Sequence, residues 1–197
     1  MRELSTDGGA GAIYQADIRS GLEIQAMIDA VLDRQDRLDV LVCNAGVASS
    51  HLVLRCPEDE WLRIIDTNLT GTYRCLTAVA PLMIKQGGGS IIVVGSYAGL
   101  HGASGQAAYA ASKAGLVGLV QTAAREWGPH NVRVNLVCPG WQPTALAGDA
   151  FPSTEQLSDH VLGRLSNLED VSRTICHLAQ LPGMSGQIVN LDSRILY

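Results

Sequence analysis

Residues 95–115, GSYAGLHGASGQAAYAASKAG, decide the fold of this chain, and they carry a serine, a tyrosine and a lysine at positions 96, 109 and 113. The apolar run SIIVV precedes them at residues 90–94. Such a run without alternation is typical of a strand covered on both faces, and residues 107–127 have a helical pattern. The segment therefore predicts a strand that leads through a glycine-rich turn into a helix, with Ser96 where the strand ends.

Tyr109 and Lys113 are one helical turn apart, so their side chains leave the same face of the predicted helix. An ammonium group near a phenol lowers the pKa of the phenol, because the opposite charge favours the phenolate. A tyrosine tuned in this way can give or take the proton that accompanies hydride transfer at a carbonyl. The hydroxyl of Ser96 would then hold the substrate oxygen. The alternative is an ordinary pair on a helix surface, since Tyr-x-x-x-Lys is a common spacing.

Apolar runs alternate with helical patterns along the chain, which predicts an α/β fold. The central sheet should be parallel and doubly wound, with its ligand outside the carboxyl ends of the strands. Gly46, Ser96 and Gly140 all fall at such ends. Strands are expected at residues 12–16, 38–43, 90–95, 132–137 and 187–191, and helices at 22–35, 58–86, 107–127, 154–162 and 168–180.

Composition fits a single globular domain over the 197 residues, of which 47% are apolar and 17% charged. The net charge is −5 and basic residues form no run, which argues against a nucleic-acid partner. Neither a signal peptide nor a membrane span is indicated, so we expect a soluble, cytoplasmic protein. We interpret the cysteines as reduced thiols rather than a disulfide or metal framework, and the histidines show no metal spacing. The cysteines are at positions 43, 56, 75, 138 and 176 and the histidines at 51, 101, 130, 160 and 177.

Three further motifs accompany the serine, tyrosine and lysine: CNAG at residues 43–46, DTNLTG at 66–71 and CPG at 138–140. In this order and at these separations, the chain from about residue 16 to 191 resembles the short-chain dehydrogenase/reductase (SDR) family. Within the family it is most similar to the 3-oxoacyl-carrier-protein reductase and carbonyl-reductase group. The resemblance implies a Rossmann-like fold, NAD or NADP as cofactor, a small carbonyl or alcohol substrate, and a homo-oligomer, dimer or tetramer.

The resemblance also implies roles for individual residues. Catalysis would rest on Ser96, Tyr109 and Lys113, and on Asn68, which in the family bends its helix and holds a water of the proton relay. Lys113 would also donate to the ribose of the nicotinamide half. A substrate lid would cover residues 142–153 beside Trp141, with Phe151 in it. The cofactor would be contacted by Asp17, Ile18, Asn44, Ala45, Gly46, Tyr109, Lys113, Pro139, Gly140 and Thr144.

The two ends of the sequence depart from the family pattern. A dinucleotide fold opens with a strand, a glycine-rich turn and a helix, whereas the early glycines at residues 8–11 have no strand pattern before them. We therefore expect one Rossmann-like domain over residues 1–197 that lacks the first βαβ unit, with a sheet that is either re-paired or left with a hydrophobic edge. An internal methionine, a start-site variant and a fragment remain open as explanations. The last strand ends in Asp192-Ser193-Arg194, where this group usually has Asp-Gly-Gly.

Two hypotheses of function follow. The first is an NAD(P)-dependent oxidoreductase that interconverts a ketone and a secondary alcohol through Ser96, Tyr109, Lys113 and Asn68. The second is a truncated, weakly active or inactive subunit that acts by associating with full-length partners. Affinity for the cofactor separates the two.

Overall fold

The computed structural model describes residues 2–6, 9–144, 146 and 157–195. Its centre is a four-stranded parallel sheet in the order β3-β4-β5-β6, which confirms the predicted α/β class and strand direction. The four strands agree with the predicted ones to within two residues at each end. They are β3 (Val40–Cys43), β4 (Gly89–Val94), β5 (Val132–Pro139) and β6 (Ile188–Leu191).

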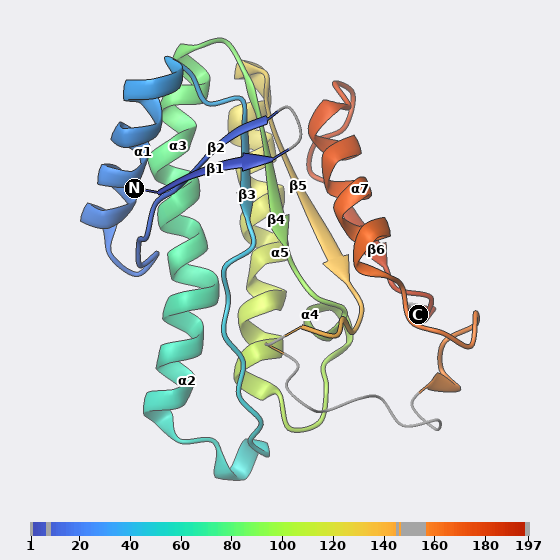
Figure 1. The fold of residues 1–197 in the computed structure, drawn as a ribbon. Helices are drawn as coiled ribbons and strands as arrows, with labels where there is room; N and C mark the ends of the chain where they lie inside the picture. The colour runs from blue at the N-terminus through green and yellow to red at the C-terminus, as the bar shows by residue number, and fades with distance from the viewer. Residues whose placement is uncertain (1, 7–8, 145, 147–156, 196–197) are drawn as a thin grey trace.

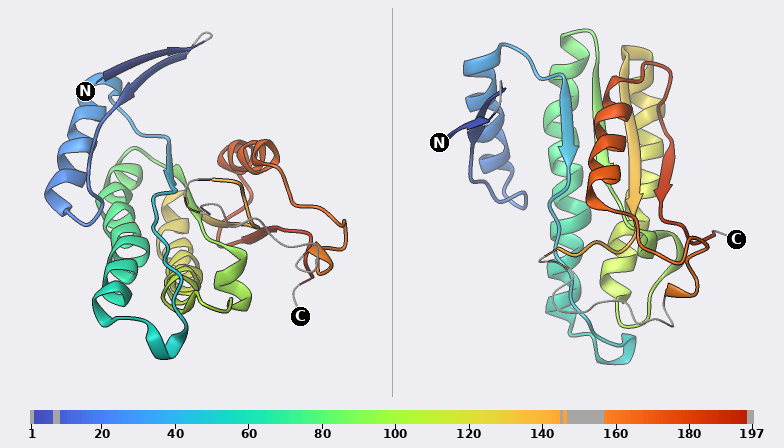
Figure 2. Two further views of the ribbon diagram at one scale, coloured as in Figure 1. Left: turned by 60° about the horizontal axis from the view of Figure 1, so that its bottom comes forward. Right: turned by 45° about the vertical axis from the view of Figure 1, so that its right-hand side comes forward.

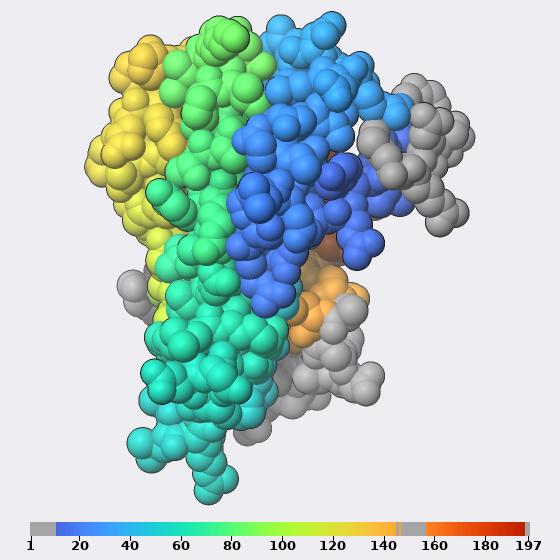
Figure 3. Space-filling model, turned by 90° about the vertical axis from the view of Figure 1, so that its left-hand side faces the viewer, coloured from blue at the N-terminus to red at the C-terminus, as the bar shows by residue number. Residues whose placement is uncertain are grey.

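Helices cover both faces of this sheet (Figure 1, Figure 2). Ile91 and Val93 of β4 pack into the main core with α1 (Gly21–Gln35), α3 (Thr72–Lys85) and α5 (Ala107–Trp127). Ile92 points to the other face, where it packs with Leu178 of α7 (Leu168–Gln180). Alternate residues of one strand thus enter two cores, as a doubly wound sheet requires. Figure 3 shows α1 alongside α3 on the outer side of the larger layer.

The predicted helix over residues 58–86 is continuous but not uniform. It consists of α2 (Glu58–Ile65), a π-helical turn η2 (Asp66–Gly71) and α3. π-turns inside α-helices are rare and occur often at functional sites. The short helix α4 (Tyr97–His101) was not predicted, nor were the 3-10 turns η1 (Val53–Arg55) and η3 (Gly128–His130). The predicted helix over 154–162 lies partly outside the described residues, and its described part from 158 to 162 forms turns and bends.

The prediction of a sheet strand at residues 12–16 was wrong. Strand β2 (Gly9–Ile13) pairs with β1 (Arg2–Thr6) as an antiparallel hairpin, separate from the parallel sheet. The early glycines were also expected to have no strand before them, but β1 precedes them. A hairpin pairs the backbone of this segment locally, without a neighbour in the main sheet.

Strand β3 is the edge of the parallel sheet among the described residues. Two of its valines, Val40 and Val42, are 40% and 42% exposed. Of the two alternatives predicted for the sheet, the described strands therefore show the hydrophobic edge and not the re-pairing, since the hairpin β1–β2 is a separate sheet. Among the described helices, none combines the length and the apolar character needed to cross a membrane.

Candidate active site

The carboxyl ends of the parallel strands bring the sequence motifs to one edge of the sheet. β3 leads into Asn44, β4 leads through Gly95 into Ser96, and β5 ends at Pro139 before Gly140. Because these strands are parallel neighbours, the segments that follow them lie side by side. The three motifs therefore lie at the strand ends, and the site that they would form stays a prediction.

Ser96 and Tyr109 meet across this edge, although 13 positions separate them in the sequence. Ser96 caps the N-terminus of α4, where its hydroxyl accepts a hydrogen bond of 3.2 Å from the N–H of Ala98. Tyr109 lies in the first turn of α5, with its phenol on the side of the Ser96 hydroxyl. Burial raises the pKa of Tyr109, and the polar Ser96 hydroxyl lowers it by less.

Lys113 is buried in the next turn of α5, with 5% of its surface exposed. Its Nζ donates a hydrogen bond of 2.8 Å to the carbonyl of Val94 and lies 5.8 Å from the centroid of the Tyr109 ring. Burial lowers the pKa of Lys113 to about 8, because the charged form loses its solvation.

One expectation about this pair was wrong. We predicted that Lys113 lowers the pKa of Tyr109, but the pKa of Tyr109 is raised and the ammonium group of Lys113 is not among the causes that act on it. The lysine is bonded to a backbone carbonyl instead, and burial of the phenol dominates.

Asn68 holds the loop after β3 to α5. It is fully buried in the π-turn η2, where its Nδ2 donates to Val47 O at 2.9 Å and to Ser112 Oγ at 3.0 Å. Its Oδ1 accepts from the N–H of Val47 at 2.8 Å. The Ser112 hydroxyl in turn donates to the backbone carbonyl of Tyr109 at 2.7 Å. All of the polar atoms of the Asn68 side chain are used, so this residue fixes two segments of the site relative to each other.

Gly46 lies where the loop, Asn68 and Lys113 come together. A Cβ on Gly46 would be 3.2 Å from Asn68 Oδ1 and 3.6 Å from Lys113 Nζ. The missing side chain therefore lets the loop backbone pack close to Asn68 and Lys113. Asn44 and Ala45, the other residues of the motif, are exposed.

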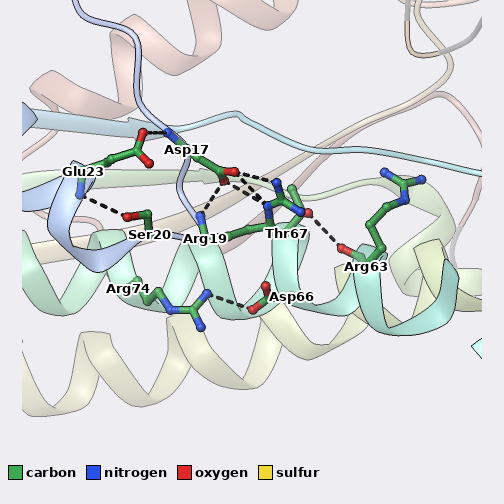
Figure 4. Close-up of polar contacts among 8 residues, drawn as sticks. All are labelled: Asp17, Arg19, Ser20, Glu23, Arg63, Asp66, Thr67 and Arg74. Atoms are coloured by element: carbon green, nitrogen blue, oxygen red, sulfur yellow. Dashed lines mark hydrogen bonds and ion pairs between the residues drawn. The ribbon is translucent and has the colours of Figure 1, made fainter. Parts of the chain in front are cut away.

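The structure places Asp17 in a polar cluster at the start of α1 (Figure 4). The Asp17 carboxylate forms an ion pair of 2.6 Å with Arg19, whose side-chain and backbone hydrogen bonds hold the pKa of Asp17 at about 2. Ile18 packs on Gly71 of η2, where a Cβ would come within 2.9 Å of the Ile18 side chain. These two residues thus lie against the π-turn that carries Asn68.

The predicted nicotinamide turn is only partly assembled. Gly140 lies against the buried carboxylate of Asp192, whose oxygen occupies the space that a Cβ would need. Thr144 is exposed, and its N–H donates to the carbonyl of Gln142 at 2.8 Å. Phe151 and most of the expected lid lie outside the described residues.

Sequence reasoning missed a stack of side chains next to Ser96. The guanidinium carbon of Arg194 lies 3.6 Å from the centroid of the Tyr97 ring, and Tyr97 stacks on His101 with centroids 5.4 Å apart. Asp192 holds Arg194 with an ion pair of 2.6 Å and also lies 3.5 Å from the buried His160. The sequence feature that could have pointed to this stack is Asp-Ser-Arg at residues 192–194, where the family group usually has Asp-Gly-Gly. The described residues contain no cluster of side chains that could hold a metal.

Comparisons with known proteins match most of the length of the chain. A family model described as Enoyl-(Acyl carrier protein) reductase matches residues 1–193. The 3-oxoacyl-[acyl-carrier-protein] reductase of Synechocystis sp. is 38% identical over 196 residues, which are 98% of this chain and 78% of the relative. The reductase FabG of Thermotoga maritima is 36% identical over 188 residues, 93% of this chain and 76% of the relative. A solved structure, titled as that of NAD+-bound xylitol dehydrogenase, superposes with a TM-score of 0.85 at 25% identity, covering 91% of this chain and 77% of that one.

Proposed function

Because the chain belongs to the short-chain dehydrogenase/reductase family, and is an oxidoreductase of that type, we propose that it interconverts a ketone and a secondary alcohol with NAD or NADP at the site around Tyr109. The names of its relatives suggest a 3-oxoacyl thioester as the ketone. The single observation that carries the proposal is the convergence of Tyr109 and the buried Lys113 on the end of β4, where Lys113 bonds the Val94 carbonyl just before Ser96. The comparisons give no support to the alternative of an inactive subunit.

The residues at the strand ends fit the nicotinamide half of the cofactor. Gly46 has no side chain to keep a ligand away from the backbone, and Lys113 offers cationic donors nearby. Asn44, Ala45, Gly46, Tyr109 and Lys113 would hold this half, with Pro139, Gly140 and Thr144 beside it and Asp17 and Ile18 toward the adenine. When bound, the cofactor supplies or accepts the hydride at the carbonyl carbon.

The chain's own residues would handle the proton and the oxygen. Ser96 would donate its hydroxyl hydrogen to the carbonyl oxygen, which fixes the oxygen beside Tyr109. Tyr109 would then give its phenolic proton to that oxygen as the alcohol forms, and take it back in the reverse direction. Lys113 would offer its donors to the ribose of the nicotinamide half, beside the Tyr109 ring. Asn68 keeps the loop after β3 fixed to α5, so it acts as a positioning residue.

We also propose that the chain forms a homo-oligomer, either a dimer or a tetramer. A groove on the outer side of α3 and α5 contains exposed or half-buried apolar side chains, among them Tyr73, Leu119 and Trp127. A second copy of the chain would cover these surfaces, as the family resemblance implies. Light scattering on the purified chain measures the mass in solution and tests this element separately.

The proposal is tested by titrating the purified chain with NADH and with NADPH, following energy transfer from its tryptophans. Micromolar binding of either dinucleotide is expected, and Lys113→Met should weaken it because the cationic donors are lost. The matched control is Lys85→Met, at the far end of α3. A folded chain that binds neither dinucleotide up to millimolar concentration would contradict the proposal and favour the subunit hypothesis.

A further inference from the structure

The chain after β6 passes beside the short helix that Ser96 caps. The guanidinium carbon of Arg194 lies 3.6 Å from the centroid of the Tyr97 ring. Tyr97 directly follows Ser96 and is the first residue of α4. A guanidinium this close to an aromatic ring is attracted to it, because the faces of the ring carry partial negative charge. Arg194 therefore holds the residue next to the serine.

Asp192 fixes the position of Arg194. Its carboxylate accepts hydrogen bonds from Nε and Nη2 of Arg194, at 2.8 and 2.6 Å. It also accepts from the backbone N–H of Arg194 at 2.9 Å. The Asp192 side chain is 1% exposed, so water has little access to these bonds. Because a guanidinium bound through two of its nitrogens has little freedom to turn, Asp192 sets the position of the group that contacts Tyr97.

Residues 192–194 are anchored to two further segments beside the site. Asp192 lies against Gly140, where its carboxylate leaves no room for a Cβ. The ring of the buried His160 lies 3.5 Å from the Asp192 carboxylate and 3.2 Å from the Ser193 hydroxyl. The N–H of Val161 donates to the Ser193 carbonyl at 3.3 Å. The ion pair of residues 192 and 194 is therefore built into the structure, unlike a pair between two exposed side chains.

The helix α4 depends on contacts of this kind for its position. It has only five residues, and isolated helices shorter than about 12–15 residues are marginal in water. Packing must therefore keep it in place. Gly99 packs on α5, while Tyr97 stacks on His101 and contacts Arg194. Because the hydroxyl of Ser96 caps α4, a shift of Tyr97 moves the serine as well.

We propose that Arg194 is a positioning residue for Ser96: it holds Tyr97, and thereby keeps the serine hydroxyl where the substrate oxygen would bind. This role rests on the proposed function, whereas the contact between Arg194 and Tyr97 does not. Arg194 is outside the set of residues proposed to hold the dinucleotide. Its loss should therefore lower turnover and leave the affinity for NADH and NADPH unchanged.

Turnover and dinucleotide affinity are measured separately on the full chain, with a 3-oxoacyl thioester as the probe substrate. Tyr97→Leu removes the ring and keeps the ion pair, and Arg194→Ala removes the guanidinium. Each should lower kcat by about 10- to 100-fold, since a misplacement of about 1 Å can cost that much. Tyr97→Phe keeps the ring and should retain the wild-type rate. Arg173→Ala, which removes an exposed arginine paired with Glu169, is the matched control for Arg194→Ala.

The route through Ser96 is tested by a double-mutant cycle. If Arg194 and Tyr97 act by holding the serine, Tyr97→Leu should not lower kcat further once Ser96→Ala has removed the hydroxyl. An equal loss in both backgrounds would overturn the positioning role, because the effect would then reach the reaction by another route. A fall in dinucleotide affinity that accounts for the lower rate, or wild-type turnover in both Tyr97→Leu and Arg194→Ala, would overturn it as well.

Hydrogen–deuterium exchange tests the contact itself, without substrate or dinucleotide. Faster exchange is expected over residues 97–102 in Tyr97→Leu and in Arg194→Ala, because α4 loses its support, while residues 116–123 of α5 should keep the wild-type rate. If Arg194→Ala does not fold, Tyr97→Leu decides alone. Unchanged exchange over residues 97–102 would overturn the support of α4 by Arg194. A folded wild type without turnover on any ketone would count against the proposed function and the role of Ser96, while exchange would still decide the contact.

Discussion

The side-chain amide of Asn68 is hydrogen-bonded to both the N–H and the carbonyl of Val47, at 2.8 and 2.9 Å. This double contact joins the loop after β3 to the π-turn η2, and a third bond to Ser112 extends the link to α5. A helical asparagine is mildly unfavourable, and the widened turn places this one where all its polar atoms are used.

Asn68→Asp should destabilise the fold. The carboxylate cannot donate to the Val47 carbonyl or to Ser112, so two buried acceptors lose their donor. We expect the free energy of unfolding to fall by about 1–3 kcal/mol, measured by urea denaturation. Thr77→Val, on the exposed side of α3, is the control and should stay near the wild type. An unchanged midpoint for Asn68→Asp would show that the amide does not hold the loop.

Gly99→Ala should loosen the contact between α4 and α5. A Cβ there would lie 2.7 Å from the carbonyl carbon of Lys113, which is backbone and cannot turn aside. The two helices must move apart, which separates Ser96 from Tyr109, so both thermal stability and turnover should decrease. Gly118→Ala, within α5, has no atom within 4 Å of the new Cβ and should stabilise the helix by about 0.5–1 kcal/mol. Equal effects of the two substitutions would contradict this packing argument.

The buried Lys113 should make stability depend on pH in the alkaline range. Its pKa is about 8 in the folded chain and 10.5 as a model value, so between these values the unfolded chain binds more protons. The free energy of unfolding should therefore gain a contribution that rises from pH 8 to pH 10.5. Comparing denaturation curves of the wild type and Lys113→Met across this range isolates the effect. The same slope in both proteins would mean that Lys113 does not titrate there.

The affinity for the dinucleotide should fall as the pH rises, whereas the free energy of unfolding rises. Lys113 loses its charge as the pH rises through about 8, so a cofactor held by that charge should bind less tightly above this pH. A titration at several pH values checks this, with Lys113→Met as the variant in which the pH effect is absent. Binding that strengthens above pH 8 would contradict the role given to Lys113.

Tyr109→Phe should remove turnover while the chain stays folded. Only the phenolic oxygen is lost, and with it the group that gives the proton to the substrate oxygen, so the rate should fall by about 10²–10⁴-fold. Circular dichroism checks the fold, and Tyr73→Phe on the exposed face of α3 is the matched control. Undiminished turnover in Tyr109→Phe would exclude it as the acid.

Much of the fold was predictable from local patterns. The apolar run at residues 90–94 and the helix from Ala107 to Trp127 appear where the sequence indicates them, because burial on both faces and helical periodicity are local signals. The hairpin β1–β2 was not predictable, since its pairing depends on which strands are available to the segment. The π-turn was also missed, because the helical pattern of the sequence looks the same whether or not one turn is widened.

The sequence predicted which residues come together in the candidate site, but it did not predict the direction in which the pKa of Tyr109 is shifted. Ser96, Tyr109, Lys113, Asn68 and Gly46 do converge. The direction of the Tyr109 pKa was wrong, since the spacing of Tyr109 and Lys113 reveals neither the burial of the phenol nor the bond from Lys113 to Val94.

The most direct test of the account is the reduction of a 3-oxoacyl thioester by the purified chain, with NADH and with NADPH, followed by the absorbance of the reduced nicotinamide. The account predicts that this absorbance falls with time, that a 3-hydroxyacyl thioester accumulates in equal amount, and that Tyr109→Phe shows neither. A folded chain that binds the dinucleotide, yet consumes none above the protein-free blank with this or other ketones, would contradict it.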